Sequence, residues 1–219
     1  KLSVYAPLLK SYFEVAGEFD FIRAKAKLAE DMNGSYPQVQ DRALVKLINA
    51  YHPLLYLYNK KAGKPTIPVN LQLTDEHRIL VISGPNAGGK TVTLKTIALL
   101  QVMMQSGLLI PVHELSEMGI FKKIFTDIGD QQSLDDDLST YSSRLQNARV
   151  FLEKATPQTL VLIDEMGSGT DPKPGGAIAE AILRQLHRKG VFAVITTHYS
   201  NLKVFAFRNP GILNGNMHF

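Results

Sequence analysis

The residues most suited to chemistry form the segment GPNAGGKT, which follows the pattern G-x-x-x-x-G-K-[ST] of phosphate-binding P-loops. In such a loop, glycines allow successive backbone N–H groups to face phosphate oxygens. The Lys90 amine can reach β- and γ-phosphates, and the Thr91 hydroxyl can ligate Mg²⁺. A tight glycine turn without a ligand would show the same pattern. The pattern predicts a nucleotide site formed by Gly84, Pro85, Asn86, Ala87, Gly88, Gly89, Lys90 and Thr91.

The segments on either side supply the strand–loop–helix context that a P-loop requires. Residues 78–83 are a short apolar run rich in β-branched side chains, which predicts a buried strand. Residues 90–105 carry apolar side chains at positions that predict a helix buried on more than one side. The positive N-terminal end of that helix would point at the bound phosphates.

Two acids close the apolar segment TLVLIDE at 159–165. Asp164 stands where a Walker B acid occurs, and the carboxyl ends of parallel strands meet at one edge of a sheet. We therefore expect Asp164 and Thr91 to converge on one Mg²⁺. Glu165 suits a general base that orients a water against the γ-phosphate, whereas a kinase would also need an acceptor site. Acids that merely cap the end of a strand would give the same pattern.

His198 closes the next apolar segment, 191–197. Its imidazole could donate a hydrogen bond to a γ-phosphate oxygen or to the attacking water. A lone histidine at a strand end is otherwise structural. We expect the strand before His198 to lie beside the strand that leads to Asp164 and Glu165. This position favours the functional interpretation of His198.

A cluster of hydroxyl side chains, STYSS at 139–143, opens a predicted helix. Serine and threonine are common N-caps, which is one explanation. A second phosphate site built from hydroxyls and helix N–H groups is the other. The spacing alone does not separate the two.

Strands alternate with helices along the chain, which predicts parallel β–α–β units and an α/β sheet. Gly107 is the expected C-cap of the P-loop helix, and residues 38–50 fit either a helix or a strand. The predicted helices are 1–32, 90–105, 142–155 and 177–186. The predicted strands are 54–58, 66–73, 78–83, 108–112, 120–127, 159–165 and 191–197, with loops at 59–64, 128–136 and 167–176.

Composition excludes several classes of protein. The chain has no cysteine, which rules out disulfides and thiolate metal sites, and no apolar run long enough to span a membrane. Its first residues lack the apolar core of a signal peptide. We therefore expect a cytoplasmic protein with no membrane partner. The net charge of +4 lies entirely in residues 1–64, where ten Lys and Arg face six Asp and Glu, a bias that a solvated helix face explains.

Four ordered motifs, GPNAGGKT, DIGDQQSLDDDLSTYSSRL, LVLIDEMGSGTDP and TTHY, resemble those of the MutS ATPases. The segments KTV at 90–92, STYSS at 139–143 and GSGTDP at 167–172 are more similar to the bacterial MutS-II branch than to the mismatch-repair branch. The resemblance implies an ABC-class P-loop ATPase with a mainly parallel sheet flanked by helices. Residues 1–37 would end a helical core or lever region, and 38–219 would form a C-terminally truncated ATPase domain.

The resemblance also implies roles for individual residues. Glu165 and His198 would be catalytic, and Val92, Ile67, Ser139 and Thr140 would join the P-loop in binding ATP. Ile67 belongs to the segment 66–69 near the adenine. Thr91, Asp164 and Gln131 would serve the Mg²⁺ site. Gln131 follows Asp130 in a loop that couples nucleotide to the DNA-binding regions.

The resemblance also implies a head-to-tail homodimer of ATPase domains, in which Ser139 to Ser143 of one chain would complete the site of the other. The resemblance implies a clamp on branched or junction DNA, or on ribosomes in a second role attributed to the family, made with domains absent here. A nuclease domain typical of the branch would also lie outside this segment. The alternatives are another ABC-type DNA-repair ATPase, of the mismatch-repair or SMC class, and a nucleotide-gated binding module with negligible turnover.

Overall fold

A parallel five-stranded sheet forms the centre of the protein. The computed structural model describes residues 5–84, 89–129 and 137–216, with 137–140 as helix backbone only. The sheet has the strand order β6-β7-β8-β4-β9, and every neighbouring pair is parallel. The strands are β4 (Ile79–Ser83), β6 (Lys123–Asp127), β7 (Thr159–Ile163), β8 (Phe192–Thr197) and β9 (Ile212–Asn216).

Strand residues alternate between two hydrophobic cores, as the period of two in a β-strand requires. Val81, Val161 and Ile195 face the core that α5 (Pro172–Arg188) and α6 (Ser200–Arg208) cover together with the end of α4 (Asp137–Lys154). Ile82, Leu162 and Val194 face the other core, which contains the buried side of α3 (Lys90–Gln105). The sheet is thus covered by helices on both faces, and the predicted α/β fold is confirmed.

A smaller sheet packs against the far side of α3. It has the order β1-β5-β2-β3, and its strands are β1 (Gln38–Gln40), β2 (Val45–Ala50), β3 (Val69–Leu73) and β5 (Glu117–Gly119). β1 and β5 are parallel, while β2 is antiparallel to both β3 and β5. The ambiguous segment 38–50 therefore consists of strands. α3 is buried on two sides because it lies between the two sheets.

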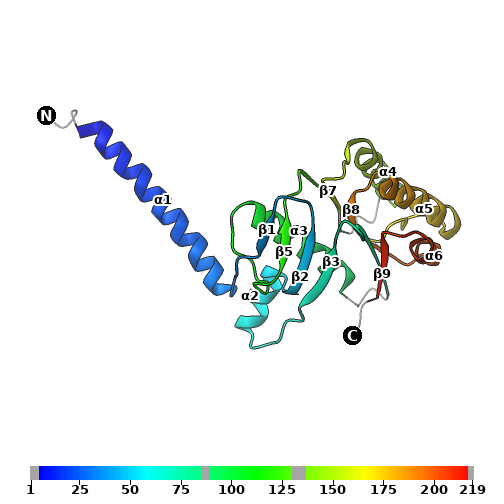
Figure 1. Ribbon diagram of the computed structural model, residues 1–219, viewed down its shortest axis with the longest axis horizontal. Coiled ribbons are helices and arrows are strands. Elements are labelled where there is room, and N and C mark those ends of the chain that lie inside the picture. The colour runs from blue at the N-terminus through cyan, green and yellow to red at the C-terminus, as the bar shows by residue number, and fades with distance from the viewer. Residues whose placement is uncertain (1–4, 85–88, 130–136, 217–219) are drawn as a thin grey trace.

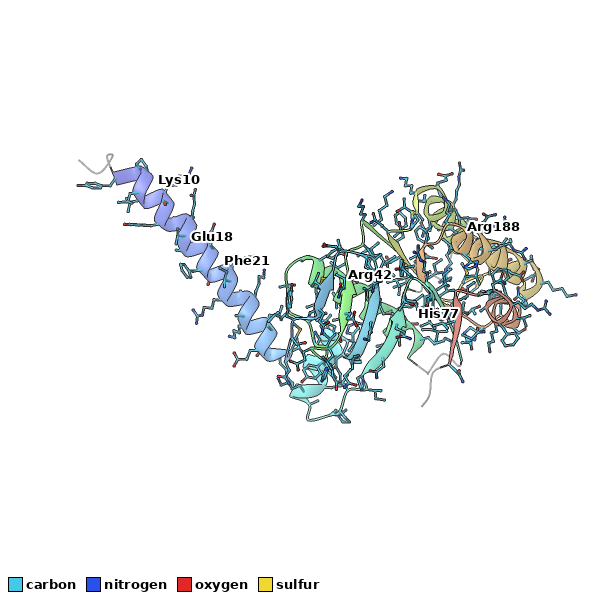
Figure 2. The ribbon with its side chains drawn as sticks, in the orientation of Figure 1. Lys10, Glu18, Phe21, Arg42, His77 and Arg188 are labelled. Carbon is cyan, nitrogen blue, oxygen red and sulfur yellow. The ribbon has the colours of Figure 1, made fainter. Side chains whose placement is uncertain are left out.

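The N-terminal helix α1 (Ala6–Asp31) is 26 residues long and projects away from both sheets (Figure 1). At 1.5 Å per residue it extends about 39 Å. Figure 2 shows Lys10, Glu18 and Phe21 along this helix, well separated from the rest of the protein. At its C-terminal end, Ala29 and Met32 are buried and join the helix to the smaller sheet. No helix in the described ranges is long and apolar enough to cross a membrane.

Two predicted strands are wrong. Residues 54–58 lie in the helix α2 (Pro53–Lys61), because Pro53 fits the first helical position and His52 Nδ1 accepts a hydrogen bond from the Leu55 N–H at 3.3 Å. The extended conformation that proline imposes on His52 is also the one that an N-cap adopts. Within 108–112 only Ile110 forms an isolated bridge, to Ser35, and Pro111 follows it directly.

Other predicted boundaries shift. α5 begins at Pro172, so part of the predicted loop 167–176 is helix, again with proline in the first turn. The segment 120–127 contains only β6, and β5 precedes it without having been predicted. The loop 59–64 is partly the last turn of α2. Gly107, with φ +72°, follows α3 and ends it as expected.

Candidate functional site

The P-loop joins the carboxyl end of β4 to the first turn of α3. Gly84 and Gly89, which bound the loop, have φ values of +137° and +78°, a region that favours glycine. Gly89 is also the N-cap of α3. The residues between them, Pro85, Asn86, Ala87 and Gly88, lie outside the described ranges. The helix thus begins directly after the segment predicted to hold phosphates.

Lys90 is the first residue of α3, and only 1% of it is exposed. Its amine donates a hydrogen bond to the Gly84 carbonyl and lies 3.2 Å from His198 Nε2. Burial lowers the pKa of Lys90 below its usual value, and the negative charges of Glu165 and Asp164 partly oppose this effect. A buried cation at a helix N-terminus is arranged to receive an anion.

Thr91 and Asp164 meet at the edge of the sheet. The Thr91 hydroxyl donates to Asp164 Oδ2 at 2.6 Å, and only 5% of Asp164 is exposed. The Thr196 hydroxyl of β8 donates to the other carboxylate oxygen, Oδ1. Mg²⁺ prefers hard oxygen ligands and is commonly held by one or two protein oxygens together with substrate phosphates. Thr91 and Asp164 fit that pattern.

Glu165 follows Asp164 in a left-handed conformation, with φ +48°. This conformation is uncommon for residues other than glycine, and it is held in place by the structure around it. The Glu165 N–H donates to the Thr196 hydroxyl at 2.7 Å. Its Oε1 lies 3.7 Å from His198 Nε2, and both side chains are partly exposed. Glu165 and His198 therefore share the mouth of the site with the buried Lys90.

Two positioning groups were not predicted from the sequence. The Thr196 hydroxyl forms hydrogen bonds with both acids. Ile163 of β7 pairs with Ile195 of β8, so the residues that follow them, Asp164 and Thr196, lie side by side. Arg144 of α4 donates to the carbonyls of Asp164 and Glu165, each at 3.3 Å. The order of the strands and the direction of α4 create these contacts, and neither was available from the residue pattern.

A third group, Tyr199, was also missed although it follows His198 directly. Its hydroxyl donates to the Gly167 carbonyl at 2.8 Å. Burial raises the pKa of Tyr199, and nearby Tyr141 adds to the effect. Its ring lies so close to Gly175 that a Cβ there would come within 2.7 Å of the hydroxyl oxygen. Tyr199 thus joins the segment after Glu165 to the start of α5.

A hollow of about 370 Å³ opens beside the P-loop helix. Its lining includes Ile67, Leu80, Thr93 of α3 and Leu213 of β9. Ile67 is 86% exposed, so its side chain is available to a ligand. Val92 of α3 is also exposed. The structure thus places Ile67 on the same hollow as a residue one turn into the P-loop helix.

The remaining predicted residues lie at or beyond the limits of the described ranges. Ser139 and Thr140 belong to the first turn of α4, whose backbone is helical, and their side chains are not described. Asp130 and Gln131 lie outside the described residues. Gly129, directly before them, has its carbonyl 3.3 Å from Arg144 Nη2. Gly129 and Arg144 therefore both lie near the two acids that follow β7.

Comparison with known proteins places this fold and this site in one family. Residues 80–219 match the family model described as MutS domain V. Proteins named Endonuclease MutS2 are similar over nearly the whole chain. Those of Lactiplantibacillus plantarum and Clostridium botulinum (strain ATCC 19397 / Type A) are 45% and 42% identical over 94% and 96% of this chain. That of Finegoldia magna is 46% identical over 94%.

These matches cover 25% or 26% of each relative, so the chain spans about a quarter of the length of the curated relatives it matches. The matched family model includes β4, α3 and every later element of the five-stranded sheet. The chain therefore belongs to the MutS family, is similar to MutS2 proteins, and carries the family's P-loop ATPase domain.

Proposed function

We propose that this chain is the module with which a MutS-II type protein binds and hydrolyses ATP. The observation that carries the proposal is the meeting of Lys90, Thr91 and Asp164 at one edge of the parallel sheet. A buried amine, a hydroxyl and a carboxylate are the three protein groups that P-loop ATPases bring to the phosphates and their metal.

In the proposed ATP complex, Lys90 exchanges its contact with the Gly84 carbonyl for phosphate oxygens. The N–H groups in the first turn of α3 face the same phosphates. Thr91 and Asp164 would hold Mg²⁺, and Gln131 would contribute to that site from the following loop. When bound, the ion would offset the negative charge of the phosphates. The adenine would lie in the hollow beside Ile67, near Val92.

Glu165 is the proposed general base. Its carboxylate would take a proton from the water that attacks the γ-phosphorus, while the bond from that phosphorus to the β–γ bridging oxygen breaks. His198 lies between Glu165 and Lys90 and would donate a hydrogen bond to a γ-phosphate oxygen or to that water. The backbone at Glu165 is left-handed, and the carboxylate lies 3.7 Å from His198 Nε2.

The site would be completed by a second copy of the chain. Ser139 and Thr140 open α4 and would present hydroxyls and helix N–H groups to the nucleotide of the partner in a head-to-tail homodimer. Residues 166–171 would cross the same interface. ATP would thus be hydrolysed only in the dimer, which is the arrangement of an ABC-class ATPase.

The work of the whole protein is a further part of the proposal. ATP hydrolysis would drive a cytoplasmic clamp on branched or junction DNA, or on collided ribosomes, through regions outside these residues. Any nuclease activity would also lie in another region, since the site here is built for phosphate transfer from ATP. Residues 1–37 would end a helical lever, and 38–219 would be the ATPase domain. The apolar side chains that α1 exposes, among them Phe13 at 81%, would then be covered by other parts of the lever.

Phosphate release and ATP binding by the full-length protein test this function. We expect Mg²⁺-dependent hydrolysis by the wild type and about 10- to 150-fold weaker ATP binding by Lys90→Ala, since a hydrogen bond to a charged group contributes about 1.5–3 kcal/mol. Lys95→Ala is the control, because Lys95 is exposed on the same helix. Binding without any turnover would favour the nucleotide-gated module, and wild-type affinity in Lys90→Ala would contradict the site.

A further inference from the structure

Arg144 of α4 contacts both acids of the proposed site through their backbone carbonyls. Its Nη1 donates to the Ser168 hydroxyl at 2.7 Å and to the carbonyls of Asp164 and Glu165 at 3.3 Å each. Its Nη2 donates to the Gly129 carbonyl at 3.3 Å. A single guanidinium therefore joins α4 to two segments that are distant in the sequence, Gly129 and residues 164–168.

Each of these segments has its own part in the proposed ATPase. Gly129 directly precedes the loop that contains Gln131. Asp164 and Glu165 carry the metal ligand and the base. Ser168 belongs to residues 166–171, the segment proposed to cross the dimer interface. The first turn of α4, about one helical turn before Arg144, carries Ser139 and Thr140.

The chemistry of the contacts requires arginine. The guanidinium is planar, stays charged, and presents five N–H donors in a fixed geometry, so it can bind several carbonyls at once. Lysine offers a single ammonium on a flexible chain. The acceptors here are carbonyls of a turn in which Glu165 has φ +48°, and the same Glu165 carbonyl also accepts from the Ser168 N–H at 3.0 Å. Arg144 thus fixes the turn that directs the Glu165 carboxylate.

We infer that Arg144 is a positioning residue that couples the start of α4 to the placement of Glu165. The inference rests on the proposed ATPase function and adds that the start of α4 controls the position of Glu165. When Ser139 and Thr140 engage the nucleotide of the partner, α4 is held in place, and Arg144 then holds the Asp164–Glu165 turn of its own chain. Occupation of one site of the dimer would in this way set the hydrolytic geometry of the other.

The test compares Arg144→Met with wild type in the full-length protein, by kcat, KM for ATP and equilibrium ATP binding. Small displacements of a reacting group cost about 10²-fold in rate, so we expect kcat to fall by about that factor. KM and the Kd for ATP should stay within about threefold, because the P-loop is not touched. Arg149→Met is the matched control. Arg149 lies on the same helix, is 78% exposed, and pairs with Glu153 at 2.7 Å.

Arg144→His gives a readout that a purely structural role would not move. An imidazole with its ordinary pKa near 6.5 carries charge at pH 6 and loses it at pH 8. The ratio of variant to wild-type kcat should therefore rise by about tenfold between pH 8 and pH 6. Arg144→Lys keeps the positive charge but lacks the planar set of N–H donors, so its kcat should lie between those of Arg144→Met and wild type. These two variants keep the test valid if Arg144→Met does not fold.

The outcomes separate this inference from the function on which it rests. A wild-type protein that does not hydrolyse ATP would overturn both. An active wild type, with Arg144→Met at the wild-type kcat or with a lowered melting temperature as its only defect, would overturn the role of Arg144 alone. An Arg144→His ratio that is the same at both pH values would also overturn it, since the charge would then have no part in positioning.

Discussion

The amine of Lys90 lies 3.2 Å from His198 Nε2, so two nitrogens that could both carry a proton face each other across the site. A lysine ammonium can only donate, so while Lys90 is charged and no phosphate is bound the imidazole nitrogen accepts in this contact. Burial already lowers the pKa of Lys90, and phosphates in the P-loop would reverse that effect by favouring the charged amine.

The affinity for ATP should therefore fall at alkaline pH, starting below the ordinary lysine value of 10.5. The free protein has the lower pKa and the complex the higher one, so the complex binds more protons in the interval between them. Across that interval Kd should rise by about tenfold per pH unit. The same linkage makes unfolding of the free protein harder as pH rises from the lowered pKa towards 10.5, since the unfolded chain then holds more protons.

Titration calorimetry with ATP between pH 7 and pH 10.5 measures this effect. Lys95→Ala should give the same profile as wild type, because it removes an exposed lysine from the same helix and leaves Lys90 in place. A Kd that stays constant over the whole range would show that the charge of Lys90 does not contribute to binding.

Glu165→Gln should bind ATP as tightly as wild type and hydrolyse it about 10²–10⁴-fold more slowly. The amide keeps the shape of the side chain but cannot accept the proton of the attacking water. Single-turnover phosphate release measures the chemical step directly. Glu153→Gln, a substitution in an exposed ion pair of α4, serves as the control and should keep the wild-type rate. Unchanged hydrolysis by Glu165→Gln would assign the base to another group.

Thr196→Val should both destabilise the protein and slow hydrolysis. Valine has nearly the same shape, but it leaves the Glu165 N–H and the Asp164 Oδ1 without the hydroxyl that each contacts. A buried polar group that loses its partner costs about 1–3 kcal/mol. Urea denaturation monitors the first effect and phosphate release the second. Thr196→Ser keeps the hydroxyl and should recover most of both, and a Thr196→Val protein as stable and active as wild type would rule out this role.

The difference between Thr196 and Lys90 shows what the sequence could predict. Lys90, Thr91 and the strand and helix around them follow a local pattern, so a contiguous segment was enough to predict them. Asp164 could be expected near Thr91 because parallel strands end at one edge. The contacts of Thr196 depend on β8 lying next to β7, and those of Arg144 depend on α4 crossing that edge. Such neighbours are fixed by tertiary packing and carry no local signal.

The differences between the predicted and observed secondary structure have two physical origins. The segment 54–58 is short and apolar, which fits either a strand or a helix. His52 is the N-cap and Pro53 the first helical residue, and together they start the helix α2 at this segment. At 38–50 the residue pattern left both possibilities open, and pairing with β3 and β5 made strands of it. A local cap thus determined the first segment, and tertiary strand pairing determined the second.

The proposed dimer predicts complementation between two inactive variants of the full-length protein. Lys90→Ala removes the P-loop charge, and the double variant Ser139→Ala, Thr140→Ala removes the hydroxyls offered to the partner. A mixed dimer has one site in which both substitutions meet and one site with neither. Random exchange makes half of the dimers mixed, so the mixture should recover up to about a quarter of the wild-type rate per chain, and less than that if coupling through Arg144 requires the other site to be occupied. Losing a preorganised donor costs about 10²–10³ in rate, so each variant alone provides a low background.

Specific activity should also rise with protein concentration until the dimer is saturated. The control mixes the single variant Lys90→Ala with a triple variant that carries Lys90→Ala, Ser139→Ala and Thr140→Ala. No dimer in this mixture has an intact site, so it should recover no activity. Activity that is independent of concentration, with no recovery on mixing the two single-site variants, would mean that each chain hydrolyses ATP by itself.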